Sequence, residues 1–193
     1  MNESNTYNKN YFNSQFLIAT PLLNGTCFEK SVIYICTHDK NGAMGLLINR
    51  SLGRLKSTDI FQQLNINGDS LMANNILVHF GGPVELSKGF VLHSCDYMND
   101  NTVNIDNNIS VTSDVKILND LTLGSGPKNS IVAFGYAGWG AGQLEGEINS
   151  NSWLNIPATK DIIFNTNNED KWQNAANLIG VDFKNYSSSY GHA

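Results

Sequence analysis

The chain has 193 residues, a length typical of one domain, and carries 12 Lys and Arg against 17 Asp and Glu, for a formal net charge of −5. Hydrophobic residues make up 41% of the chain, which excludes a wholly disordered protein. The basic residues form no run, and this disfavours a nucleic-acid partner, because such binders usually present a basic stripe to phosphates.

The first residues, the apolar stretches and the cysteines indicate the cellular compartment of the protein. The chain opens without a basic segment and apolar run of the kind found in secretory signals, and its apolar stretches are too short to cross a bilayer. The three cysteines, Cys27, Cys36 and Cys95, are odd in number and irregularly spaced. We therefore expect reduced thiols in a cytoplasmic protein, with no membrane partner.

Polar residues without hydrophobic periodicity occupy both ends of the chain, at 1–13 and 184–193. We expect disordered tails there and one domain over 14–183. Within it, short apolar and β-branched runs predict strands at 16–19, 31–37, 43–49, 76–80 and 89–94. The Asn41-Gly42 turn predicts a hairpin. Ser57 is typical of the N-cap of a short helix.

The second half of the chain adds helices to further strands. Polar residues 96–108 predict a loop, and apolar runs predict strands at 109–112 and 130–136 and extended segments at 153–156 and 161–164. Helices are predicted after a Ser113 or Asp114 cap, around Leu144, and at 168–179. Strands outnumber helices and several are joined by hairpins, so the expected fold class is α+β rather than a doubly wound parallel sheet.

Cysteine and histidine pairs provide the only pattern that suggests a metal. Cys36 with His38, and His93 with Cys95, would each share one strand face, and together they would supply four zinc ligands. The spacing is not that of a structural zinc site, and nothing makes the two strands neighbours. We therefore expect no metal and no cofactor, with the cysteines buried and the histidines hydrogen-bonded.

Two glycine-rich corners permit close backbone approach. The segment 136–145 has strand, Gly-rich turn and helix in that order, which suits either an anion at the helix start or a tight turn that packs Trp139 inward. Gly81-Gly82-Pro83 is likewise either a structural corner or a binding loop. No cysteine follows a known nucleophile signature and no carboxylate pair is spaced for acid–base work, so no catalytic residue is assigned.

Taken together and in order, several segments resemble the YqgE/AlgH family of bacterial proteins over residues 14–193. The resemblance is carried by Phe16-Leu17-Ile18-Ala19-Thr20-Pro21, Phe28 with Ser31-Val32, His38-Asp39 with Gly42-Ala43-Met44-Gly45-Leu46, Ile48-Asn49, Gly81-Gly82-Pro83-Val84, Gly89-Phe90-Val91-Leu92-His93-Ser94, and Gly135-Tyr136-Ala137-Gly138-Trp139 with Gly142-Gln143-Leu144-Glu145. The polar loop 96–108 and Cys95 depart from the family pattern.

The resemblance implies a single α+β domain with a bifurcated, partly barrel-like sheet surrounded by helices. It implies no established activity, although one branch of the family carries a transcriptional-regulator label. The residues it carries over are the polar motif positions His38, Asp39, Asn49, His93, Gln143 and Glu145. Our hypothesis is that several of them converge with Gly81, Gly82 and Trp139 on one surface cleft.

Three functions remain open at this point. The absence of a catalytic constellation, with the family's label, favours a non-catalytic regulatory or adaptor protein that acts through a protein or small-ligand partner. The alternative is an enzyme of undetermined class that uses His38 or His93 as acid or base near neutral pH. Direct DNA binding comes last because of the net negative charge.

Overall fold

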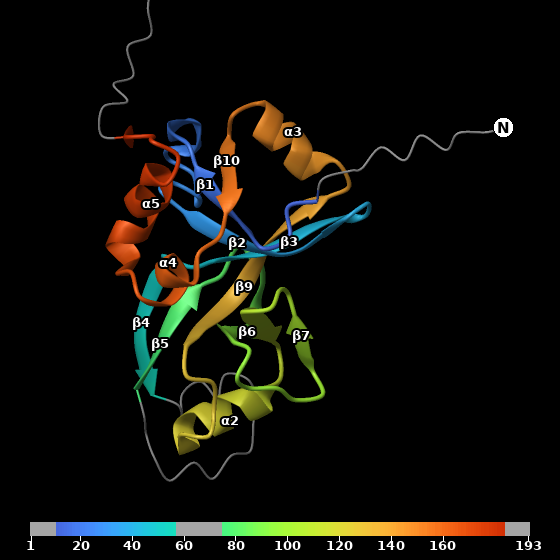
Figure 1. Cartoon of the computed structure of the whole chain (residues 1–193), viewed down its shortest axis with the longest axis vertical. Coiled ribbons are helices and arrows are strands. Elements are labelled where there is room, and N and C mark those ends of the chain that lie inside the picture. Colours follow the sequence, from blue (N-terminus) through green and yellow to red (C-terminus); the bar gives the residue numbers. More distant parts are fainter. Residues whose placement is uncertain (1–10, 57–74, 184–193) are drawn as a thin grey trace, which may run out of the picture.

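The computed structural model describes residues 11–56 and 75–183 (Figure 1). Strands in these residues join into a single connected sheet. The strands are β1 (Gln15–Ala19), β2 (Val32–Asp39), β3 (Gly42–Leu47), β4 (Ser51–Lys56), β5 (Asn75–Phe80), β6 (Val84–Ser94), β7 (Thr102–Asn104), β8 (Ile109–Thr112), β9 (Ser130–Gly140) and β10 (Trp153–Pro157).

The sheet divides at strand β9. Its main path runs β10-β1-β2-β3-β9-β6-β8-β7, and the β4–β5 ribbon branches from β9. Residues 132–134 of β9 pair in parallel with β5, while 137–140 pair antiparallel with β3, so β5 and β3 follow one another along the same edge. Strand β6 takes the opposite edge. The expected α+β class and the divided sheet are confirmed.

Glycines make this division possible. Gly81 and Gly82 connect β5 to β6, and Gly81 N–H donates to Phe134 O on β9 (2.8 Å). A Cβ atom on Gly82 would overlap the backbone of Tyr136, and one on Gly135, whose φ is +71°, would overlap the carbonyl of Gly82. Only glycine lets two backbones approach this closely. The Gly-Gly-Pro segment is therefore a structural corner.

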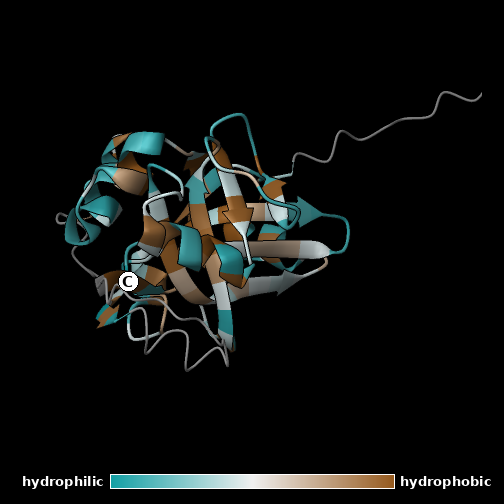
Figure 2. Ribbon diagram, turned by 90° about the horizontal axis from the view of Figure 1, so that it is seen from below, coloured by the Kyte–Doolittle hydropathy of each residue, from teal (hydrophilic) through white to brown (hydrophobic). Residues whose placement is uncertain are grey.

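The strands β1, β2 and β3 are buried on both faces, which is why their sequences read as continuous apolar runs. Alternate residues enter different clusters: Phe16 and Ile18 pack into one, and Leu17 and Ala19 pack into the other. Figure 2 shows the hydrophobic strands gathered inside the molecule and the hydrophilic residues on its outer surfaces.

Helices cover the sheet on different sides. They are the 3-10 turn η1 (Pro21–Leu23) and the α-helices α2 (Val115–Leu123), α3 (Gln143–Asn149), α4 (Lys160–Phe164) and α5 (Asn168–Asn177). Helices α4 and α5 supply residues to the first cluster, α3 to the second, and α2 to a third, beside β5, β6 and β9. In Figure 1, α2 lies at the opposite end of the molecule from α3.

Local signals predicted most of these elements. The hairpin at Asn41-Gly42, the Asp114 cap of α2 and its Gly124 stop are confirmed. The prediction of an extended 161–164 is wrong, because Thr159 caps a short helix there and accepts a hydrogen bond from Ile162 N. The predicted loop 96–108 contains strand β7. The helix predicted from Ser57 lies outside the described residues.

Candidate functional site

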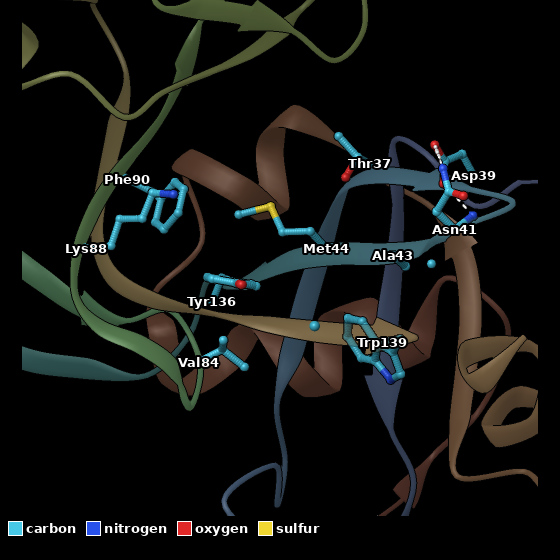
Figure 3. Close-up of a pocket in the computed structure, with 12 residues that line it drawn as sticks. Thr37, Asp39, Asn41, Ala43, Met44, Val84, Lys88, Phe90, Tyr136 and Trp139 are labelled. Carbon is cyan, nitrogen blue, oxygen red and sulfur yellow. Dashed lines mark hydrogen bonds between the residues drawn. The ribbon is translucent and has the colours of Figure 1, made fainter. Parts of the chain in front are cut away.

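An open groove of about 610 Å³ crosses one face of the sheet (Figure 3). Four strands contribute to it. The lining residues are Thr37 and Asp39 of β2, Asn41 of the following turn, Gly42, Ala43 and Met44 of β3, Val84, Lys88 and Phe90 of β6, and Tyr136, Gly138 and Trp139 of β9.

The middle of the groove is apolar and its ends are charged. Met44 and Tyr136 lie between Lys88 on one side and Asp39 on the other (Figure 3). The Tyr136 ring meets the Phe90 ring edge-on, with centroids 5.8 Å apart. The Lys88 ammonium lies 5.4 Å from the centroid of Phe90. Such a surface offers apolar contact area with one charge of each sign at its ends.

One carboxylate of helix α3 holds the Trp139 side chain on the face of β9 opposite the groove. Glu147 Oε2 accepts hydrogen bonds from the indole N–H groups of Trp139 (2.9 Å) and Trp153 (2.8 Å). Gln143 links the same carboxylate to the strand, because its Nε2 donates to Glu147 Oε1 (2.9 Å) and its Oε1 accepts from Gly140 N (3.0 Å). Gln143 therefore supports the Trp139 side chain through Glu147.

His38 and Glu145 meet on the opposite face of β2 from the groove. The His38 side chain alternates with Thr37 and Asp39 along the strand, so it points toward α3. Its Nε2 atom lies 3.5 Å from Glu145 Oε1. Of the sequence-predicted residues, Asp39 therefore faces the groove. His38, Glu145 and the Trp139 side chain lie behind it.

The remaining predicted residues do not line the groove, so the structure does not bring them together with Asp39 there. Asn49 bridges two backbones: its Oδ1 accepts from Val32 N and its Nδ2 donates to Lys30 O, both at 2.9 Å. Gly81 and Gly82 form the backbone corner described above. His93 pairs with Ser130 at the far end of β9 from the groove.

The environment of His93 also argues against acid–base chemistry. Its exposure is 0%, and its ring nitrogens lie 2.9 Å from Ser94 O and from Thr112 Oγ1. Burial lowers the pKa of His93, and burial together with the positive charge of Lys171 lowers the pKa of His79. No substrate reaches the His93 nitrogens without breaking this packing.

Cys36 is not an activated thiolate. Cys36 is buried mid-strand, and burial raises its pKa to about 12, so the thiol keeps its proton. Over residues 11–56 and 75–183, no three His, Cys, Asp or Glu side chains gather as metal ligands would. In those same ranges, no helix has the length and apolar character needed to span a bilayer.

Most groove residues were not singled out in advance. Thr37, Met44, Lys88, Phe90 and Tyr136 became neighbours only through strand pairing, which the sequence does not specify. The sequence signal that could have identified these residues is the two-residue spacing of aromatic and polar side chains along the predicted strands. Glu147 was not assigned to the site, although its i, i+4 spacing from Gln143 predicts the contact that they make.

Comparison with known proteins identifies the family. A sequence profile described as AlgH-like (DUF179) matches residues 16–184. The chain belongs to the AlgH-like family. It is 43% identical over 190 residues to a UPF0301 protein of Afipia carboxidovorans, covering 95% of this chain and 90% of that one. It is 42% identical over 183 residues to a UPF0301 protein of Rhodospirillum rubrum, covering 95% of each chain.

Solved structures support the same assignment. The solution structure of AlgH from Pseudomonas aeruginosa matches with a TM-score of 0.77 and 34% sequence identity, over 100% of both chains. A crystal structure of a protein from Corynebacterium diphtheriae matches with a TM-score of 0.64 over 91% of each chain. Its 18% identity supports the fold alone. The described residues 11–56 and 75–183 thus have the AlgH-like fold.

Proposed function

We propose that this AlgH-like chain is a non-catalytic regulatory or adaptor protein of the cytoplasm that holds an extended segment of a partner protein in the groove beside β9. The observation that carries the proposal is an open groove of about 610 Å³ with an apolar middle. A small ligand is usually enclosed over most of its surface, whereas a peptide segment occupies an open channel. The openness therefore favours a polypeptide.

Exposed apolar side chains on the rim support a protein partner. Val84 and Leu86 are 36% and 58% exposed, and Leu86 lies in the part of β6 that leaves its register with β9 between Val84 and Gly89. Clustered exposed apolar residues beside a concave surface are typical of interaction sites. The charges of Lys88 and Asp39 at the two ends would orient the bound segment.

A matched pair of charge insertions tests the site. Val84→Glu places a carboxylate in the groove, and Val103→Glu places one on strand β7, where Val103 is 54% exposed. Partners captured from lysate by the wild-type chain are identified by mass spectrometry, purified, and titrated calorimetrically against all three proteins. We expect Val84→Glu to weaken binding by about tenfold or more, because burying an unpaired charge in an interface costs at least about 1.4 kcal/mol.

The Val103→Glu variant should bind as the wild type does. Both variants should retain the wild-type circular dichroism spectrum and melting temperature within experimental error. Equal binding by the two variants would exclude the groove as the site, and so would failure to capture any partner. A small molecule that copurifies with the wild type and is lost from Val84→Glu would replace the polypeptide with a small ligand.

A further inference from the structure

Residues 11–13 are held against the sheet by His38. The backbone N–H of Phe12 donates to His38 Nδ1 (3.0 Å), and the Phe12 ring stacks on the imidazole with centroids 5.2 Å apart. The Tyr11 ring meets the imidazole edge-on, also at 5.2 Å. These contacts leave His38 only 4% exposed. The segment therefore covers the imidazole and depends on it for a backbone hydrogen bond.

This hydrogen bond fixes the protonation state of the ring. A ring nitrogen that accepts from an N–H group must carry a lone pair, so Nδ1 is unprotonated in the closed arrangement. The single ring proton is then on Nε2, which faces Glu145 Oε1 at 3.5 Å. A second proton would convert Nδ1 into a donor and set it against the N–H group of Phe12. The closed arrangement is thus compatible only with neutral imidazole.

We propose that His38 is a proton-operated latch: protonation of Nδ1 releases Tyr11 and Phe12 and uncovers an ion pair between His38 and Glu145. The Glu145 carboxylate compensates for the lost hydrogen bond to Phe12, because it stabilises the imidazolium. Asn13 sets the limit of the released segment. Its side chain accepts from His38 N (2.6 Å) and donates to His38 O (3.0 Å), and neither bond involves the imidazole.

The other groups around the ring do not compete for the proton. Helix α3 contributes Glu145 and Glu147, and the Glu147 carboxylate already accepts from two indoles and Gln143. The covering segment contributes the Tyr11 phenol. Strand β3 and residues 137–140 of β9 carry no ionisable side chain. On β2 itself, Asp39 points to the groove face.

The full chain, labelled with ¹⁵N, provides a direct test. Ring ¹⁵N shifts of His38 and hydrogen-exchange protection of the Phe12 amide are followed between about pH 5 and pH 8, the range in which imidazoles titrate. Above the midpoint we expect the Nε2–H tautomer. Through the midpoint we expect Phe12 protection, corrected for intrinsic exchange, to fall by about fivefold, since one hydrogen bond contributes about 1 kcal/mol.

Three variants separate the latch from a general effect of acid. His38→Gln retains a side-chain acceptor that does not titrate, so Phe12 protection should become independent of pH. Glu145→Gln removes the stabilising charge and should move the midpoint to lower pH, whereas Asp39→Asn, a change on the opposite face, should leave it near the wild-type value. A buried amide of β2, that of Ile33, should keep its protection throughout.

Wild-type data alone can overturn the proposal, whether or not each variant folds. An Nδ1–H tautomer at high pH would do so. Protonation of His38 without loss of Phe12 protection would also do so, as would a ring that stays neutral across the range. Because the latch and the groove lie on opposite faces of β2, loss of partner binding in Val84→Glu would leave the latch intact.

Discussion

Residues 130–134 of strand β9 are enclosed between neighbouring strands, whereas residues 136–140 of the same strand border the open groove. The enclosed end holds two histidines, His79 opposite Ala133 and His93 opposite Ser130. Both imidazoles are buried and hydrogen-bonded. At the open end, residues of four strands line a groove that is open to solvent.

At the enclosed end of β9, histidines, which are common in active sites, therefore contribute to packing. At the open end, ordinary strand residues form the groove. The lowered pKa values of His79 and His93 follow from burial, so both rings stay neutral at physiological pH and stabilise the sheet. The two ends of β9 differ in solvent access, and this access depends on where β3, β5 and β6 begin and end along it.

The largest expected effect on the free energy of unfolding is at Gly82, which lies against β9 between its enclosed and open ends. Gly82→Ala would place a Cβ atom inside the backbone of Tyr136, so β6 would have to move away from β9. We expect the free energy of unfolding to fall by about 3 kcal/mol, as in overpacked cores. Urea denaturation measures it. Gly146→Ala is the control, because nothing lies within 4 Å of its added Cβ and alanine favours helix α3. Equal stability of the two variants would mean that the strands do not approach closely there.

A smaller effect is expected at the open end, where Glu147 holds two indoles. Glu147→Ala leaves the N–H groups of Trp139 and Trp153 without their acceptor, and both side chains are buried. We expect a loss of about 2 kcal/mol in unfolding free energy, the cost of unsatisfied buried donors. Glu147→Gln keeps one acceptor oxygen and should lose about half as much. If the free energy of unfolding were unchanged in both variants, the Trp139 and Trp153 indoles would be held by packing alone.

Sequence reasoning succeeded where local signals are sufficient. The β-branched runs of β2 and the Asp114 and Gly124 ends of α2 each specify an element without reference to distant residues. It failed at residues 161–164, where two isoleucines in a four-residue segment fit a strand and a helix equally well.

The site was predicted less completely, for a physical reason. Asn49 and His93 were chosen because their side chains are polar, but their polar atoms satisfy backbone and hydroxyl groups inside the fold. Met44 and Tyr136 were overlooked because a groove on a sheet face depends on the register of β3 with β9. Register is a long-range property, and one residue of slip would turn either side chain to the opposite face.

The smallest effect is expected near the enclosed end, where Lys171 is buried and its ammonium donates to Ile48 O (2.8 Å). Burial lowers the pKa of Lys171 from its ordinary value of 10.5 to about 8. Above pH 8 the folded chain has released a proton that the unfolded chain still binds, so this group makes stability rise with pH up to about 10.5. Cys36, whose pKa burial raises from 9.0 to about 12, acts in the opposite direction above about pH 9.

Comparison with Lys171→Met isolates the lysine, because both proteins retain Cys36. From pH 7 to pH 9, the wild type should gain about 1 kcal/mol of unfolding free energy relative to the variant. The exposed Lys116 provides the control: the difference between wild type and Lys116→Met should stay constant with pH. A constant difference for Lys171→Met as well would mean that its ammonium is hydrated in the folded protein. The buried polar groups beside β9 would then resemble those of the open end, and solvent access would no longer distinguish the two.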